Sequence, residues 1–356
     1  MFDKHRAIAD NVSMMKRELP GTYHDFLAQL KALHARLQRA LVQHHRETAI
    51  ESMSAVAHEG EGEGDTQYAI DVDADRILTE FCEEWGREVP FVLVSEGISD
   101  TGERVFPVGA DSHTARFRMI VDPIDGTRGL MYDKRSAWIL TGVAPNNGDG
   151  TNLQDIEVAL QTEIPTTKQD RYDVQWAVRE QGAAGERRDL NSGEATSLAL
   201  RPSSSTTFLH GFATVSNFFP GGKALIAEIE DELFTAIVGE AKPGKAQIYT
   251  DQYISTGGQL NELMVGHDRF ICDIRSLVHA RLLGGRDVPL CVRPYDLCTE
   301  LIAREAGCVV VHPDGSPLTD PLDTKTNMSW VGHANCHLCA RVQPLFEEIL
   351  RHHRLI

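Results

Sequence analysis

The sequence predicts an α+β protein, and three patterns indicate this class. Apolar residues recur at helical spacing over 23–46, amid Lys, Arg, Gln and His. Four short apolar runs have the length and composition of strands, and they lie at 90–94, 117–121, 137–144 and 156–162. Helical spacing returns at 222–238 and near Leu297–Ala306 in the second part of the chain.

The N-terminal region is predicted to be helical over 3–47, with a break at Pro20-Gly21. The strongly amphipathic part, about 23–46, should pack against the body of the protein or against another subunit. Residues 58–66 then alternate glycine with acid, which predicts a mobile loop. The alternative is a flap that brings an acidic ligand to a binding site.

Three aspartates, Asp71, Asp73 and Asp75, precede a second helical pattern that continues to Trp85. They lie at the N-terminal end of this helix, where the helix dipole tolerates negative charge. Capping explains one such aspartate, but three within five residues exceed what a cap requires.

Asp122 and Asp125 follow the strand predicted at 117–121, with Pro123 between them. Pro123 cannot continue a strand ladder, so we expect the strand to end there. Two carboxylates three residues apart on a turn can converge on one point and suit a hard cation such as Mg²⁺. The backbone N–H groups of Gly126 and Thr127 would face an anion if they open a helix or turn. The alternative is an acidic surface turn.

Two further acids occupy positions where sites are commonly built. Glu96 follows the strand at 90–94, and Asp296 precedes the helical pattern that ends at Gly307. Asp296 read alone could be a helix N-cap. The polar, turn-rich segments 145–151 and 184–206 are predicted to be surface loops, and a glycine turn at 254–258 should lead into a helix before a strand at 269–273.

Composition excludes several classes of protein. The 356 residues carry 35 Lys and Arg against 52 Asp and Glu, and the net charge of -17 argues against a nucleic acid polymer as partner. No apolar run is long enough for a membrane span, and the first residues do not resemble a secretion signal. The seven scattered cysteines predict a cytoplasmic protein without disulfides. Cys336 and Cys339 have the spacing of zinc ligands, but no second pair accompanies them.

Three segments together resemble the inositol monophosphatase family of Mg²⁺-dependent, Li⁺-sensitive phosphatases, which includes fructose-1,6-bisphosphatases and 3′-phosphoadenosine nucleotidases. They are Val94–Glu96, Val121–Thr127 and Tyr295–Gly307. The resemblance implies a layered α-β-α-β-α sandwich of the sugar-phosphatase type and a homodimer. It implies an N-terminal half, 1–205, with the long helices and the metal motifs, and a C-terminal half, 206–356, with the Asp296 helix.

The resemblance also implies a set of metal ligands. Glu96, Asp122 and the carbonyl of Ile124 would bind one ion, and Asp122, Asp125 and Asp296 would bind a second. Oxygen ligands of this kind suit Mg²⁺, with Mn²⁺ as an alternative.

Further roles follow from the same resemblance. Gly126 and Thr127 would hold the phosphate through backbone N–H groups, and Thr127 with Glu96 would orient the attacking water. Asp75 would act near a third metal ion, with Asp71 and Asp73 as rivals for that position.

Two departures from the family pattern concern activity and substrate. The second of two consecutive acids after the first strand is replaced by Gly97, so we expect weakened tuning of the metal site rather than lost metal binding. Residues 277–295 look inserted, and the window where family members that bind inositol carry an acid holds Pro289, Cys291 and Arg293. Inositol phosphate is therefore disfavoured as substrate.

The predicted function is metal-dependent hydrolysis of a small phosphate monoester, whether a sugar, polyol or nucleotide phosphate, by a water activated between Mg²⁺ ions. A haloacid-dehalogenase-type phosphatase is disfavoured because Pro123 stands where its nucleophile would be. The other alternative is a catalytically degenerate member that binds metal or phosphate. Specificity should come from 207–222, 251–259 and 277–295, where Arg293 and Lys223 are candidates for a second phosphate site.

Overall fold

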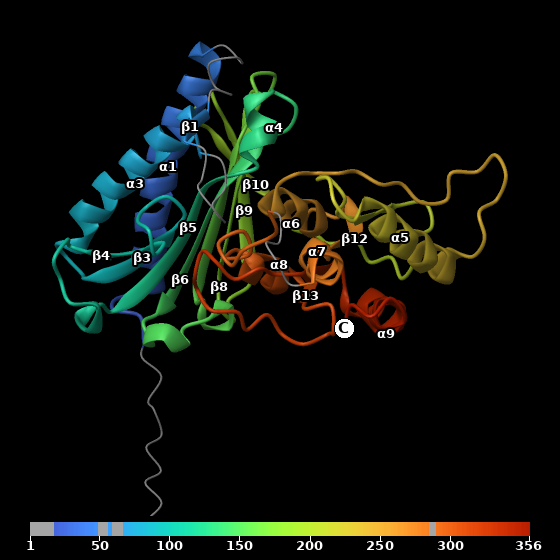
Figure 1. Ribbon diagram of the computed structural model, residues 1–356. Coiled ribbons are helices and arrows are strands. Elements are labelled where there is room, and N and C mark those ends of the chain that lie inside the picture. Colours follow the sequence, from blue (N-terminus) through green and yellow to red (C-terminus); the bar gives the residue numbers. More distant parts are fainter. Residues whose placement is uncertain (1–17, 49–55, 59–66, 285–289) are drawn as a thin grey trace, which may run out of the picture.

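The computed structural model describes residues 18–48, 56–58, 67–284 and 290–356, and it consists of alternating layers of helices and sheets (Figure 1). The helix predicted over 3–17 and most of the loop predicted over 58–66 lie outside the described residues. A small two-stranded sheet is formed by β1 (Val56–His58) and β2 (Gln67–Tyr68).

The first layer contains the long helices α1 (Tyr23–Glu47) and α3 (Ala69–Gly86), which confirms the helix predicted at 23–46. A capping box starts α1, because the Thr22 side chain accepts from the Asp25 amide while the Asp25 carboxylate accepts from the Thr22 amide. The buried face of α1 contacts β6 and β7, and α3 contacts β5. The apolar residues of α1 that form this face are Phe26, Leu30, Leu33, Leu37, Leu41 and Val42.

An eight-stranded sheet forms the second layer, in the order β10-β9-β8-β7-β6-β5-β3-β4. All neighbours are antiparallel except β3 and β5, which are parallel. The central strands are buried on both faces because helices cover both sides. The strands are β3 (Phe91–Ser95), β4 (Glu103–Phe106), β5 (Phe117–Asp125), β6 (Ala137–Pro145), β7 (Val158–Ile164), β8 (Arg171–Val178), β9 (Ala183–Asp189) and β10 (Ala195–Leu198).

The prediction of a loop over 184–206 is wrong for its first part, because this segment supplies β9 and β10. Both strands lie at one edge of the sheet, where exposed polar side chains are common. Arg187 of β9 pairs with Asp173 of β8 at 2.7 Å, so charged residues here stabilise strand pairing.

The third layer contains α6 (Thr256–Met264) and α8 (Glu300–Ala306), which lie between the two larger sheets. Helix α6 contacts both β6 and β12, and α8 contacts β7, β8, β9 and β13. The prediction that Asp296 begins this last helix needs correction. The helix starts at Glu300 after the N-cap residue Thr299, and Asp296 lies in the preceding turn.

A four-stranded sheet, in the order β11-β12-β14-β13, forms the fourth layer, and helices cover its outer face. Its strands are β11 (Phe212–Val215), β12 (Asp268–Asp273), β13 (Val309–Val311) and β14 (Trp330–His333). Helices α5 (Lys223–Val238) and α9 (Cys336–His352) contact β11 and β14, respectively. The remaining helices are α4 (Thr127–Met131), α7 (Arg275–Leu283) and three short 3-10 turns at Ser112–Thr114, Gly148–Gly150 and Leu153–Asp155.

Three apolar clusters hold these layers together. One joins α1 and α3 to the large sheet, the second fills the space between the two sheets around α6 and α8, and the third joins α5 and α9 to the small sheet. The predicted α-β-α-β-α sandwich is therefore confirmed. The division into halves near residue 205 stays a prediction, although the large sheet ends at Leu198 and the small sheet begins at Phe212. No helix in the described part of the chain is long and apolar enough to cross a membrane.

Candidate metal centre

A cavity of about 360 Å³ lies where several elements end close together. Its walls come from the first turns of α3, the end of β3, the end of β5 with the start of α4, the start of α6, and the turn before α8. These elements belong to different layers, so the fold brings together acids that are far apart in the sequence. The predicted site residues that line the cavity are Asp71, Asp75, Glu96, Asp122, Ile124, Asp125, Gly126, Thr127 and Asp296.

The strand β5 does not end at Pro123, which corrects the prediction. It continues to Asp125 through a bulge, in which Asp122 pairs with Leu140 and Asp125 pairs with Trp138 of β6. Two residues separate the aspartates where one separates their partners, so Pro123 lies in the irregular part of the ladder and need not donate a hydrogen bond.

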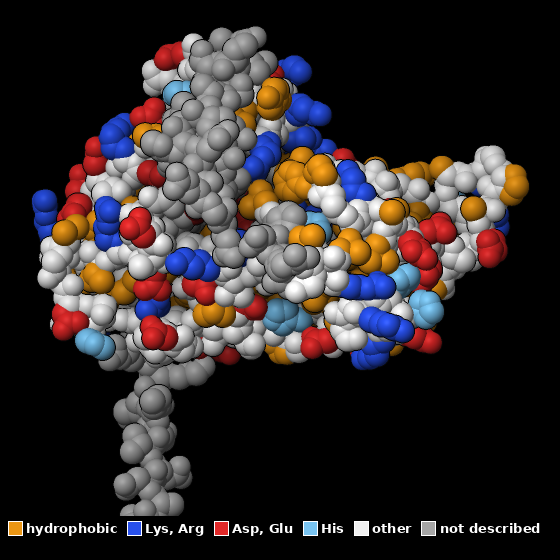
Figure 2. Space-filling model, viewed as in Figure 1, with side chains coloured by type: hydrophobic (Ala, Val, Ile, Leu, Met, Phe, Trp, Pro, Cys, Tyr) orange, Lys and Arg blue, Asp and Glu red, His pale blue; other side chains and the backbone are white. Residues whose placement is uncertain are grey.

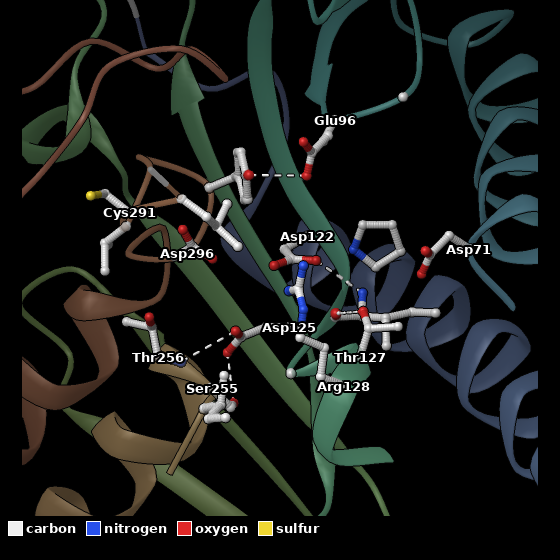
Figure 3. Close-up of a pocket in the computed structure, with 18 of the residues that line it drawn as sticks. Asp71, Glu96, Asp122, Asp125, Thr127, Arg128, Ser255, Thr256, Cys291 and Asp296 are labelled. Carbon is white, nitrogen blue, oxygen red and sulfur yellow. Dashed lines mark hydrogen bonds between the residues drawn. The ribbon is translucent and has the colours of Figure 1, made fainter. Parts of the chain in front are cut away.

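The bulge lets the carboxylates of Asp122 and Asp125 approach each other and that of Asp296. One carboxylate oxygen from each lies within 4.8 Å of the others, and Figure 3 shows the three side chains around one space. We call this group the Asp triad. Three carboxylate oxygens at this spacing are the donor set that a hard divalent cation prefers.

Asp125 is held in place by the beginning of α6. Its carboxylate accepts hydrogen bonds from the Ser255 hydroxyl at 2.8 Å and from the amides of Thr256 and Gly257 at 3.2 and 2.6 Å (Figure 3). Gly257 lies so close that a Cβ there would be 2.4 Å from Leu140 Cδ2. A residue from β5 is therefore oriented by a helix that begins 131 residues later.

Negative charge is concentrated in the Asp triad. Burial raises the pKa of Asp122 well above its usual range, and the nearby Asp125 and Asp296 raise it further. Burial and then the Asp125 charge also raise the pKa of Asp296. Burial raises the pKa of Asp125 to about 6, although its hydrogen bonds from α6 act in the opposite direction. A bound cation would relieve this repulsion.

The segment after the bulge turns sharply into α4. Gly126 is the N-cap of α4 with φ of +96°, and a Cβ there would lie 2.9 Å from Ser255 Cβ. Glycine suits this position because it adopts a positive φ without strain and has no Cβ to collide with Ser255. The Thr127 hydroxyl donates to the Ile124 carbonyl at 2.9 Å, and the Asp122 carboxylate accepts from the Ile124 amide at 3.0 Å.

Glu96 lines the same cavity but lies outside the Asp triad. Its carboxylate accepts a hydrogen bond from the Tyr295 hydroxyl at 3.0 Å, which links the end of β3 to the residue beside Asp296 (Figure 3). Burial raises the pKa of Tyr295, so this hydroxyl keeps its proton. The adjacent Gly97 has φ of +78° and adds no ligand where the family pattern has an acid.

The structure separates the three aspartates of α3. Asp71 and Asp75 line the cavity together with Ala74, because positions three and four apart share one face of a helix. Asp73 points elsewhere, with its carboxylate 3.5 Å from His44 and 3.7 Å from Arg76. Asp73 is therefore not among the residues that line the cavity, whereas both Asp71 and Asp75 are.

Two basic lining residues, Arg128 and Arg275, were not predicted from the sequence, whereas Phe218 and Phe219 lie in the segment 207–222 that was predicted to contribute to specificity. The Arg275 guanidinium lies over both phenylalanine rings, at 4.5 and 5.1 Å, and pairs with Asp273 at 2.6 Å.

The basic residues suggested for a second phosphate site do not line the cavity. Arg293 is buried and donates to the Lys325 carbonyl. Lys223 is exposed at the first position of α5. Cys336 and Cys339 lie at the start of α9 as free thiols and belong to no group of metal ligands among the residues described.

Comparison with protein-family models gives no match, and comparison with curated proteins gives none either. Solved structures do match over nearly the whole chain. Fructose-1,6-bisphosphatase from Leishmania major, in its holo form, has a TM-score of 0.66 at 15% identity, covering 92% of this chain and 96% of its own. The extragenic suppressor protein suhB from Bartonella henselae has a TM-score of 0.60 at 15% identity, covering 91% and 99%. An IMPase from Thermotoga maritima has a TM-score of 0.58 at 14% identity, covering 92% and 99%. These similarities show that the chain has the fold of these proteins.

Proposed function

We propose that this protein is a phosphatase that hydrolyses a small phosphate monoester with the help of divalent cations, Mg²⁺ in the first place. The observation that carries the proposal is the Asp triad, which places three carboxylate oxygens within 4.8 Å of one another inside a cavity. Two of the matched structures are, by name, a fructose-1,6-bisphosphatase and an IMPase, which supports the same class of activity.

The donor set fits a hard cation because it consists of oxygen atoms alone. Asp122, Asp125 and Asp296 would hold one ion, and Glu96, Asp122 and the Ile124 carbonyl would hold another. The Ile124 carbonyl already accepts from Thr127, but its second lone pair is available. When bound, such cations neutralise phosphoryl oxygens and lower the pKa of water.

Residues of the chain would position the phosphate and the attacking water. The Thr127 hydroxyl gives its proton to the Ile124 carbonyl, so its oxygen can accept a hydrogen bond from water. The Tyr295 hydroxyl donates to one carboxylate oxygen of Glu96. The other carboxylate oxygen would thereby be oriented to accept a hydrogen bond from the attacking water. The amides of Gly126 and Thr127 are proposed to bind the phosphate, with Asp75 acting near a further ion.

The substrate is proposed to be a small metabolite, since a cavity of about 360 Å³ is at the lower end of the size range of ligand sites. Cys291 and Val292 line the wall where an acid would bind the hydroxyls of inositol. Phe218 and Phe219 add further apolar surface. We therefore rank sugar and nucleotide phosphates ahead of inositol phosphates.

Hydrolysis of p-nitrophenyl phosphate, measured with and without Mg²⁺, tests the activity. We expect Mg²⁺-dependent turnover by the native protein and none by Asp122→Asn. Asp73→Asn is the matched control, because Asp73 carries the same charge near the site but points away from the cavity. If neither the native protein nor Asp122→Asn hydrolysed p-nitrophenyl phosphate, the proposed phosphatase activity would be refuted. A panel of sugar, nucleotide and inositol phosphates then identifies the substrate.

A second candidate function is metal or phosphate binding without catalysis, and Gly97 in place of an acid favours it. Calorimetric binding of Mg²⁺ without turnover of any panel member would identify this case. We further propose inhibition by Li⁺ and a homodimer, which turnover in LiCl and light scattering test. The seven free thiols support a reducing, cytoplasmic setting.

A further inference from the structure

A second group of metal-type ligands lies far from the Asp triad in the fold, where α5 meets the end of α9. It consists of Glu232 on α5, His352 at the last position of α9 and His353 at its C-cap. One ligand atom from each lies within 4.8 Å of the others. In the described parts of the chain this group and the Asp triad are the two clusters with such geometry.

The three side chains already have a separation that suits a metal ion. His353 Nε2 lies 3.0 Å from Glu232 Oε1. Two ligand atoms of a tetrahedral Zn²⁺ lie about 3.3 Å apart, so an ion can replace the shared proton with little movement. His353 is buried with 8% of its surface exposed, whereas His352 is exposed, and its ring lies edge to face against that of His353 with centroids 5.2 Å apart.

The surroundings favour a cation as well. A cavity of about 590 Å³ adjoins the group, and Asp231, Glu240 and Glu348 line it together with Glu232 and His352. Glu348 precedes His352 by one helical turn, so both point to the same side of α9. The last carbonyl groups of α9 add partial negative charge at this end. Figure 1 shows α5 and α9 together in the outermost layer, and this cavity shares no lining residue with the Asp triad's cavity.

We propose that Glu232, His352 and His353 form a binding site for Zn²⁺ that is separate from the phosphatase centre. Two imidazole nitrogens with one carboxylate are a ligand set that Zn²⁺ accepts and Mg²⁺ disfavours, whereas the Asp triad offers oxygen alone. The two sites would therefore select different metals, Zn²⁺ at the histidine-containing site and Mg²⁺ at the Asp triad. Zinc at this position would tie the C-terminal end of α9 to α5.

Figure 2 shows histidine and acidic side chains over the α5 and α9 side of the molecule, so ions from solvent can reach this surface. The test is calorimetric titration of the full-length protein with Zn²⁺ in excess Mg²⁺, which occupies the oxygen ligands first. We expect one Zn²⁺ per chain for the native protein. His352→Ala and Glu232→Gln should each weaken Zn²⁺ binding by at least about tenfold. Removing a residue that merely hydrogen-bonds to a metal ligand already has an effect of that size.

Two control variants separate this site from other zinc-binding groups. His267→Ala removes an exposed histidine whose Nδ1 lies 2.6 Å from Glu262, a pair without a second histidine. Cys336→Ser removes the exposed thiol at the start of α9. Both should bind Zn²⁺ like the native protein. Loss of binding in either control, or undiminished binding in His352→Ala and Glu232→Gln, would overturn the proposal, as would no binding by the native protein.

Thermal unfolding gives a second readout that needs no enzyme activity. Zn²⁺ should raise the Tm of the native protein and leave that of His352→Ala unchanged, because a ligand bound only by the folded state stabilises it. The two proteins should have the same Tm without metal, since His352 is exposed. An equal rise in Tm for both would contradict a site that uses His352.

Discussion

At the scale of single residues, the Asp triad has a geometry that could hold a cation, and it places like charges close together. Asp122 is surrounded by Asp125, Asp296 and Glu96, and all three raise its pKa in addition to burial. Like charges held this close oppose folding when no cation is bound.

Replacing Asp122 with asparagine should separate function from stability. We expect Asp122→Asn to lower phosphatase activity by at least about 100-fold, as expected for a lost metal ligand. The same variant should unfold at a higher temperature in EDTA, because one repelling charge is gone while the acceptor for the Ile124 amide remains. Thermal unfolding in EDTA checks this, and a lower Tm than that of the native protein would contradict it.

Ser255 tests how strongly Asp125 depends on its orientation. Its hydroxyl donates to Asp125 at 2.8 Å and accepts from the Gly258 amide at 2.9 Å as the N-cap of α6. Ser255→Ala should therefore cost about 1–2 kcal/mol of stability. It should also raise the Mg²⁺ concentration for half-maximal activity by about tenfold. Ser255→Thr keeps the hydroxyl and is the control, and an unchanged Mg²⁺ requirement in Ser255→Ala would argue against this positioning role.

At the scale of elements, α1 is attached to the large sheet by more than apolar contacts. His34 is buried on this helix, and its Nδ1 and Nε2 lie 2.9 Å from the hydroxyls of Thr162 on β7 and Thr141 on β6. Burial lowers the pKa of His34 to about 3. The imidazole is therefore neutral in the folded protein wherever the fold survives.

This histidine should make stability depend on pH. Between pH 6.5 and about 3 the unfolded chain binds a proton at His34 that the folded protein does not, so stability falls as pH falls. The slope from this residue is at most about 1.4 kcal/mol per pH unit. Urea unfolding at several pH values should show a flatter dependence for His34→Gln and a native slope for His24→Gln, which changes an exposed histidine on the same helix. Identical slopes for His34→Gln and the native protein would rule out this contribution.

The elements also show what the sequence could predict. Helix α1 was recognisable because its 25 residues repeat one apolar period many times. The continuation of β5 past Pro123 was not, since a bulge leaves no mark in the apolar pattern. The polar strands β9 and β10 were mistaken for a loop because an edge hairpin buries little.

The same distinction applies to the candidate site. Asp122, Asp125 and Asp296 could be identified from their sequence context. The contacts that orient Asp125 and Glu96 could not, because Ser255 lies 130 residues from Asp125 and Tyr295 lies 199 residues from Glu96. Contacts over such separations are created by the packing of layers and leave no local signal.

At the scale of the whole molecule, the Asp triad combines residues from two layers of the fold, the large sheet and the region before α8. Asp122 and Asp125 come from the large sheet, whereas Asp296 comes from the turn that leads into α8 between the sheets. A cation that binds all three would stabilise the folded arrangement over the unfolded chain. Metal binding and folding should therefore be coupled.

This coupling predicts that Mg²⁺ raises the Tm of the native protein. At 100 times the dissociation constant the gain is about 2.7 kcal/mol, which corresponds to several degrees. Asp296→Asn should lose most of this response, because the ion then lacks its ligand from the second half of the chain. Differential scanning calorimetry in Mg²⁺ and in EDTA measures the shift, and Asp73→Asn should respond like the native protein. A full shift in Asp296→Asn would show that the ion does not join the large sheet to the turn before α8.

The hydrogen bonds between Asp125 and the start of α6 have a practical consequence for protein engineering. A chain divided between β10 and β11 gives one fragment with Asp122 and Asp125 and another with α6 and Asp296. Neither fragment contains all the proposed ligands, so under the proposed function phosphate release after mixing would report that the fragments have reassembled. The fold would thus allow a split reporter, whose signal requires the two fragments to associate.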